Sequence, residues 1–242
     1  INITPEKIAV NKDEEAFRLK YIKAGPLATP ELATEQAIKE IIHFSEISRK
    51  GLGYVRNAIN ETDPDKFEDY RAKLVKYEEI SDRIEYEIAA FLNAVSSEEI
   101  SEKTSYEIKA MYKIIGELES LGDSGEAISR ILSRRNIHKK TFDENTIKKL
   151  NSMVDLVDNA YKAMIENLNA ASDNTLVEIS NAYAAEERIN AKRNDLRDEE
   201  IESIENERKN YLTSVYYMDV VRSMYLRMCT NARLKFRNLA II

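Results

Sequence analysis

Proline and glycine are scarce in this sequence, and both are missing from residues 126–242. All four prolines lie at or before Pro64, and all six glycines lie at or before Gly125. Proline costs a helix interior about 3 kcal/mol and glycine about 1 kcal/mol, so a long stretch without either is what long helices require. Runs of alternating β-branched residues bounded by Gly or Pro clusters, which are typical of strands, are also missing. The sequence therefore predicts an all-α protein.

Cysteine occurs only once, and long apolar runs and an excess of positive charge are absent. The single Cys229 excludes an internal disulfide and is compatible with a reducing compartment. No apolar run approaches the ~18 residues that a membrane span needs. The formal net charge of −7 argues against nucleic acid as a partner and against simple docking on anionic lipid. Because the chain starts at Ile1 without an initiator Met, we expect it to be a fragment of a longer protein.

Two prolines are placed where helices begin. Thr29-Pro30-Glu31 and Asp63-Pro64 each put a capping side chain before a proline at the first helical position. Apolar and small residues then recur every three or four positions, as on the buried face of a helix. The second helix has its seam at Phe67, Tyr70, Leu74, Tyr77, Ser81, Ile84, Ile88, Phe91 and Val95, and the third at Ile108, Met111, Ile115, Leu118, Gly122 and Gly125.

Two acidic pairs flank these seams. Glu78 and Asp82 each follow a position of the second seam by one residue, and Glu119 and Asp123 do the same on the third. Residues four apart share a helix face. The Ser-rich turn at 96–105 makes the helices antiparallel, so that 78 lies level with 123 and 82 with 119. We expect these carboxylates to converge at one level of a bundle. The alternative is that they are solvated and paired with Lys or Arg.

Three glycines interrupt the third helix around its acidic pair, at Gly116, Gly122 and Gly125. Glycine costs a helix interior roughly 0.5–1 kcal/mol relative to alanine, so a local need for space is expected. We expect Gly122 to remove side-chain bulk beside the converging acids.

A degenerate internal repeat is visible in the second half. Glu186-x-x-x-Asn190 echoes the first acidic pair at an offset of 108 residues, and the same offset from the second pair leads to Arg227 and Asn231. The helix around residues 153–168 can be superposed on the first helix at about the same offset. This arithmetic predicts two three-helix bundles in tandem.

Three stretches together resemble a known family. ELESLGDSGEAIS (117–129) resembles the signature of the PhoU family, and YEEISDRIEYEI (77–88) resembles that family's other acidic helix. LKYIKAGPLATPELATEQAIKEIIHFSEI (19–47) resembles the segment that joins the membrane domain of bacterial sodium/phosphate cotransporters to a C-terminal PhoU-like domain. The resemblance covers about residues 18–237 and weakens after 180.

The resemblance implies a fold and a metal site. PhoU-like proteins consist of two antiparallel three-helix bundles related by an internal pseudo-twofold, and they bind multinuclear metal through acidic pairs. Carried over to this chain, the first-repeat metal ligands are Glu78, Asp82, Glu119 and Asp123. Fe, Zn, Mn or Mg is the cofactor that this resemblance implies, and oxygen-only ligands suit hard cations.

The sequence departs from the family pattern at several of these positions. Ser120 stands where the family signature has Arg. In the second repeat the acids are replaced by Asn190, Arg227 and Asn231, and only Glu186 is kept. We expect the fixed positive charge of Arg227 to take the place of metal in this degenerate site by pairing with Glu186.

The resemblance implies a regulatory domain of a sodium-dependent phosphate transporter. Residues 1–28 are expected to be a linker from a membrane domain, 29–139 the first three-helix bundle and 140–242 the second. The domain would lie at the cytoplasmic face of the inner membrane and contact the membrane domain of the same polypeptide, which handles sodium and phosphate. Self-association into a homo-oligomer is left open, and no catalytic activity is expected.

The rival hypothesis is a free-standing helical regulator of phosphate signalling that binds a transporter or a sensor kinase. Residues 1–28 distinguish the two hypotheses, because a tether to a membrane domain should be extended and poorly packed, while a free-standing regulator needs no such segment. An enzyme ranks third, since helical di-iron sites usually carry Glu-x-x-His on each of two helices, whereas this chain has the spacing only once, at Glu40 and His43. His43 and His138 are expected at the surface or at helix ends, and Cys229 is expected to be a packed thiol.

Overall fold

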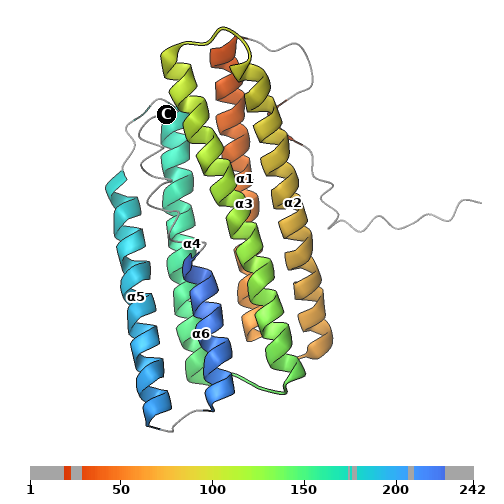
Figure 1. Ribbon diagram of the computed structural model, residues 1–242, viewed down its shortest axis with the longest axis vertical. Coiled ribbons are helices and arrows are strands. Elements are labelled where there is room, and N and C mark those ends of the chain that lie inside the picture. Colours follow the sequence, from red (N-terminus) through yellow and green to blue (C-terminus); the bar gives the residue numbers. More distant parts are fainter. Residues whose placement is uncertain (1–18, 23–28, 174, 176–178, 207–209, 227–242) are drawn as a thin grey trace, which may run out of the picture.

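The prediction of an all-α protein is confirmed. The computed structural model describes residues 19–22, 29–173, 175, 179–206 and 210–226, and no strand occurs among them. Its six helices are α1 (Pro30–Asn60), α2 (Pro64–Ser96), α3 (Glu102–Ile137), α4 (Glu144–Ser172), α5 (Ile179–Glu205) and α6 (Tyr211–Leu226). Consecutive helices run in opposite directions, and all six lie roughly parallel to the long axis of the molecule (Figure 1).

Helices α1 and α2 begin where the sequence predicts, whereas α3 begins at Glu102, inside the Ser-rich stretch 96–105 that was expected to be a turn. The helix caps differ in strength. The Asp63 carboxylate accepts hydrogen bonds from the backbone N–H groups of Asp65 and Lys66, at 2.9 and 3.2 Å. Ser101 caps α3 in the same way. Thr29 occupies the N-cap position of α1, but its side chain makes no cap hydrogen bond. The proline that follows Thr29 therefore contributes more to this helix start than the threonine hydroxyl does.

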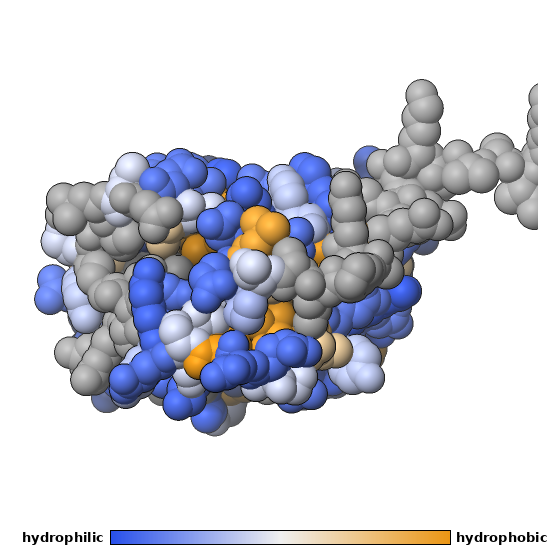
Figure 2. Space-filling model, turned by 90° about the horizontal axis from the view of Figure 1, so that it is seen from above, coloured by the Kyte–Doolittle hydropathy of each residue, from blue (hydrophilic) through white to orange (hydrophobic). Residues whose placement is uncertain are grey.

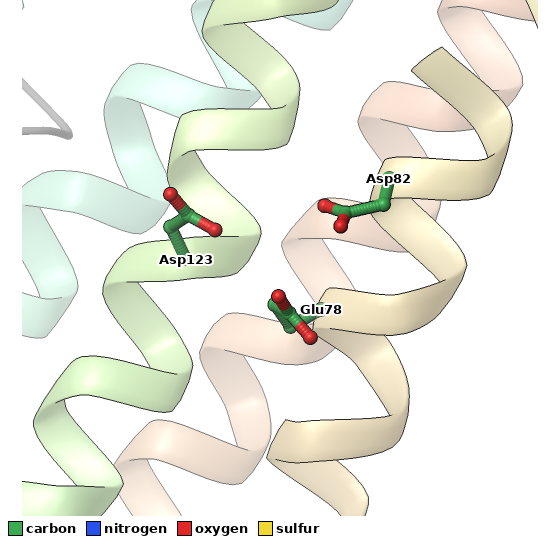
Figure 3. Close-up of side chains that lie close together, drawn as sticks. All are labelled: Glu78, Asp82 and Asp123. Carbon is green, nitrogen blue, oxygen red and sulfur yellow. The ribbon is translucent and has the colours of Figure 1, made fainter. Parts of the chain in front are cut away.

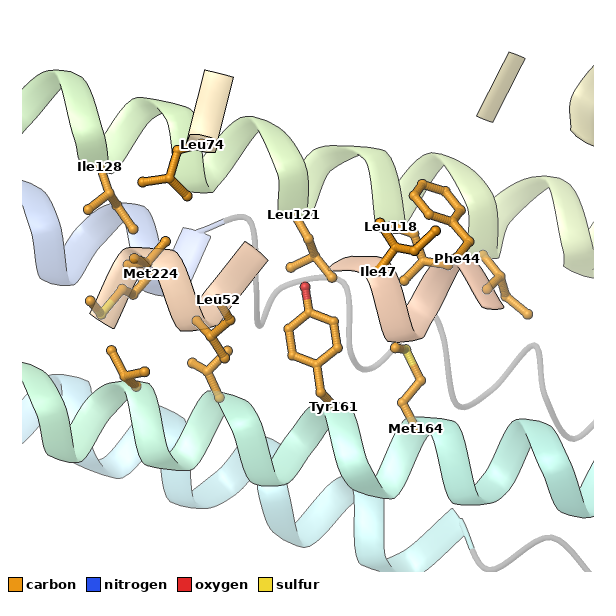
Figure 4. Packing of buried hydrophobic residues seen from close by; sticks show 14 of the residues in the cluster. Phe44, Ile47, Leu52, Leu74, Leu118, Leu121, Ile128, Tyr161, Met164 and Met224 are labelled. Carbon is orange, nitrogen blue, oxygen red and sulfur yellow. The ribbon is translucent and has the colours of Figure 1, made fainter. Parts of the chain in front are cut away.

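One hydrophobic core runs through all six helices. α1, α2 and α3 contact one another pairwise, and so do α4, α5 and α6. Contacts between α1 and α4 and between α3 and α6 connect the two groups. Figure 4 shows Tyr161 and Met164 of α4 pointing toward Leu118 and Leu121 of α3 and toward Phe44 of α1. Helix α3 is therefore held by packing from both halves of the chain, whereas α2 contacts only α1 and α3 among the described helices.

Gly122 allows α2 and α3 to approach closely, but the group that fills its space was not the expected one. A Cβ atom at Gly122 would lie 2.7 Å from the Ser81 Oγ and 2.8 Å from the Ser81 Cβ. The missing side chain thus makes room for the buried Ser81 and not for the acidic side chains. A Cβ atom added at Gly125 would also meet a neighbour, because it would lie 3.3 Å from the Leu74 side chain. A Cβ atom added at Gly116 would have no neighbouring atom within 4 Å.

A short N-terminal segment is docked on α1. The backbone N–H groups of Tyr21 and Ile22 donate to Oε2 of Glu40, at 2.6 and 3.3 Å, and Glu40 is fully buried. Leu19 and Ile22 pack against the hydrophobic core. Residues 19–22 therefore differ from the poorly packed tether that we expected, while the rest of the stretch 1–28 lies outside the described residues.

The described surface is polar at the end that carries the α2–α3 turn. Figure 2 shows this end, where hydrophilic residues predominate and a small group of hydrophobic residues is visible between them. Within the described ranges, no helix has both the length and the apolar character required to cross a bilayer.

Candidate functional site

The acidic side chains are placed by the seams of α2 and α3. Leu74 and Ser81 on α2 are buried, as are Leu118 and Gly125 on α3, so each helix turns a fixed face toward its neighbour. Glu78 lies next to this seam and is half-buried at the edge of the helix interface. The residues that flank a buried stripe on two antiparallel helices necessarily face one another along the same edge.

Three carboxylates converge at this edge, from two different helices. Glu78 and Asp82 of α2 and Asp123 of α3 each offer one oxygen, and these oxygens lie within 4.8 Å of one another. Figure 3 shows the three side chains pointing into the space between the two helices. Oxygens that bind one hard cation at about 2.0–2.6 Å are separated by up to about 4–5 Å, so the spacing fits a shared ion.

The electrostatic environment of this cluster opposes full ionisation. Burial raises the pKa of Glu78, and the charges of Asp82 and Asp123 raise it further. The pKa of Asp82 is raised by partial burial of its carboxyl group and then by Asp123. Like charges held close together favour the binding of a proton or of a cation. The cluster is therefore suited to binding a positive charge.

Glu119, the fourth expected ligand, lies beside this cluster and not within it. Its carboxylate accepts a hydrogen bond of 3.2 Å from the Ser120 hydroxyl. Burial raises the pKa of Glu119, and Asp123 and Asp82 raise it further, while Ser120 lowers it. Three of the expected first-repeat residues are thus brought together, and Glu119 adds negative charge to their surroundings.

Sequence reasoning missed Glu126, which also contributes to the site. It lies one helical turn beyond Asp123 on α3, and its charge raises the pKa of Glu78. The same carboxylate forms an ion pair of 3.0 Å with Arg130. Its spacing of three residues from Asp123 was the available signal, because such residues share a helix face.

The degenerate second site is described only in part. Glu186 and Asn190 lie on α5, and both are half-buried. Oδ1 of Asn190 is buried and has no hydrogen-bond partner among the described residues. Arg227 and Asn231 lie outside the described residues, so the expected pairing of Arg227 with Glu186 stays a prediction.

The two histidines are separate from the acidic cluster. Nδ1 of His43 on α1 lies 3.7 Å from Oε2 of Glu46. His138 lies at the C-terminal cap of α3, where its Nδ1 contacts the Tyr216 hydroxyl. The prediction of a helix-end position for His138 is confirmed, and Cys229 lies outside the described residues.

Comparison of the chain with protein-family models, with curated protein sequences and with solved structures finds no match in any of the three.

Proposed function

We propose that this chain is a regulatory helical domain that binds a hard divalent cation through Glu78, Asp82 and Asp123. The observation that carries the proposal is the convergence of these three carboxylates from α2 and α3. Two of them carry raised pKa values that a bound cation would relieve. Oxygen ligands alone favour Mg²⁺, Mn²⁺ or Fe²⁺ over Zn²⁺, which is more often held by nitrogen and sulfur.

The finer architecture that we propose is PhoU-like, with two three-helix bundles in tandem related by an internal pseudo-twofold. The pairwise contacts within α1–α3 and within α4–α6 support this division. Residues 29–139 and 140–242 are the two proposed bundles. The cation site then belongs to the first bundle, and Glu186 and Asn190 occupy the corresponding helix of the second.

The regulated activity that we propose is phosphate uptake by a sodium/phosphate cotransporter. The resemblance of residues 19–47 to the linker of such transporters supports this, and the domain would contact the membrane part at its cytoplasmic face. Glu40 holds part of that linker on α1, which offers a path from the membrane domain to the helical body. No catalytic role is proposed.

The second candidate is a free-standing regulator that binds a partner protein through a face of the bundle. The docking of Tyr21 and Ile22 on Glu40 favours it, because a segment packed on the helical body need not be a tether. The coding sequence upstream of Ile1 distinguishes the two candidates. Membrane spans encoded there support the transporter domain, and their absence supports the free-standing regulator.

The cation site is tested by titrating metal-free protein with Mn²⁺ in a calorimeter. We expect saturable binding to the wild-type chain and a loss of binding in Asp123→Asn. Asp195→Asn is the matched control, because Asp195 is an exposed aspartate of α5 outside the cluster. Mn²⁺ should also raise the melting temperature of the wild type and of the control, because a ligand that binds only the folded state stabilises it.

Two results would contradict this proposal. One is the absence of saturable Mn²⁺ or Mg²⁺ binding to correctly folded wild-type protein. The other is equal binding by the wild type and Asp123→Asn, which would place the ion elsewhere. Circular dichroism of each variant confirms that a lost signal does not come from unfolding.

A further inference from the structure

A groove lined by arginines lies on the same two helices as the acidic cluster. It has a volume of about 520 Å³, and its charged lining is Arg71 of α2 with Arg130 and Arg134 of α3. Ser133 adds a hydroxyl group, and Ala127 and Ile131 complete the lining. The groove falls in the range of about 300–1,000 Å³ that is usual for small-molecule sites. Its basic lining contrasts with the overall charge of −7.

The hydrogen-bonding capacity of these arginines is only partly used. Arg71 pairs with Glu68 at 2.8 Å through Nη1, while its Nε is buried and has no hydrogen-bond partner among the described residues. Arg134 is exposed, and no described acidic residue forms an ion pair with it. A buried N–H group without an acceptor is costly, so a ligand that supplies an acceptor would be favoured.

Helix-dipole stabilisation accounts for only part of this cluster. Arg134 lies in the last turn of α3, where positive charge is favourable. Arg71 lies about two turns inside α2, and the dipole effect is confined to the first and last turns. The meeting of Arg71 with the arginines of α3 therefore calls for another explanation.

We propose that this groove binds a phosphate-type oxyanion, with Arg71, Arg130 and Arg134 as donors and Glu126 as an internal competitor for Arg130. The planar guanidinium group donates paired hydrogen bonds that match the oxygens of a phosphate group. The size of the groove suits a chain of linked phosphates as well as a single phosphate. Glu126 holds Arg130 at 3.0 Å in the absence of ligand and must be displaced when the anion binds.

The inference goes beyond the proposed function and does not rest on it, because no cation takes part in the contacts. The two sites nevertheless share a neighbour. The charge of Glu126 raises the pKa of Glu78 in the acidic cluster, and its carboxylate pairs with Arg130 in the groove. Arg71 lies seven residues before Glu78 on α2, which corresponds to about 10 Å along a helix.

The test is calorimetric titration of metal-free protein, in buffer without divalent cations, with inorganic phosphate and separately with inorganic tripolyphosphate. Ionic strength is matched with chloride. We expect saturable binding of at least one titrant. The titrant that binds more tightly shows whether the groove prefers a single phosphate or a chain of linked phosphates. Arg130→Gln/Arg134→Gln should weaken that binding by at least about tenfold, because two charge-assisted donors are lost.

Two further variants make the result specific to the groove. Glu126→Gln should tighten binding by about two- to fivefold, which corresponds to release of one exposed ion pair. Arg197→Gln should bind like the wild type, since Arg197 is an exposed arginine of α5 outside the groove. A gain of affinity in Glu126→Gln cannot come from unfolding.

Three results would overturn the inference. They are the absence of saturable heat with either anion, unchanged affinity in the double arginine variant, and unchanged or weaker affinity in Glu126→Gln. Each variant is first checked by circular dichroism, so that a loss of helix is not counted as a loss of binding.

Discussion

At the scale of single residues, the acidic cluster makes stability depend on pH. The carboxyl groups of Glu78 and Asp82 have pKa values above their ordinary values of 4.5 and 3.8. In the pH range just above those values, the folded chain holds protons that the unfolded chain has released. The contribution of these groups to the free energy of unfolding therefore decreases as the pH rises from the ordinary pKa values through the raised values of the folded chain.

We accordingly expect Asp82→Asn to stabilise the metal-free chain at pH 7. The gain should be small, roughly 0.5 kcal/mol, because the side chain is exposed and solvent screens its charge. The difference from the wild type should shrink as the pH falls below 4. Urea denaturation across this pH range measures it, with Asp195→Asn as the control that lies outside the cluster. A destabilising effect of Asp82→Asn at pH 7 would show that an unrecognised basic partner balances the cluster.

At the scale of elements, the contact between α2 and α3 depends on one small residue. Gly122→Ala would bring a Cβ to 2.7 Å from the Ser81 Oγ. Overpacking a buried contact costs typically about 1–3 kcal/mol, which exceeds the roughly 0.5–1 kcal/mol that alanine gains in helix propensity. We expect a net loss in the free energy of unfolding, measured by urea denaturation.

The matched control is Gly116→Ala on the same helix. No atom lies within 4 Å of its added Cβ, so the propensity gain should remain and the variant should be more stable than the wild type. Ser81→Gly should relieve the clash when combined with Gly122→Ala. A stabilising effect of Gly122→Ala alone would mean that α2 and α3 separate at no cost. In that case the glycine would not explain the close approach that positions the acids.

At the scale of the whole molecule, the two groups of helices are joined by packing and by ion pairs. Arg49 of α1 holds Asp158 of α4 through two hydrogen bonds of 2.6 and 3.2 Å. Arg56 of α1 pairs with Asp155 of α4 at 2.6 Å. Both pairs lie over a hydrophobic core that is continuous between the two groups. We therefore expect α1 to α4 to unfold as one cooperative unit.

Helix α5 should be the least protected of the first five helices in hydrogen exchange. It contacts only α4 and α6 among the described helices, and its buried apolar side chains are Ala182, Ala185, Ile189 and Leu196. Two of these are alanines, so little apolar surface resists local opening. Hydrogen exchange followed by mass spectrometry measures the order in which the helices lose protection. Equal protection of α5 and α1 would show that the chain opens only globally.

Much of the local structure follows from the sequence alone. Helix starts at Pro30 and Pro64 depend on proline and capping chemistry within a few residues, and the absence of proline after Pro64 allows long helices. The pairing of Glu78 with Asp82 on one face requires only the helical period. The approach of Asp123 was predictable because a short turn makes α2 and α3 antiparallel.

The remaining features were decided by tertiary packing, because they depend on distances between helices that no local pattern contains. Glu119 and Asp123 are both acidic and lie one turn apart on α3, yet only Asp123 joins Glu78 and Asp82 of α2 within 4.8 Å. The partner of Gly122 is Ser81, since the seams pack at one particular depth. Arg71 meets the arginines of α3 for the same reason. The sequence determines which residues share a face, and packing between faces determines which of them touch.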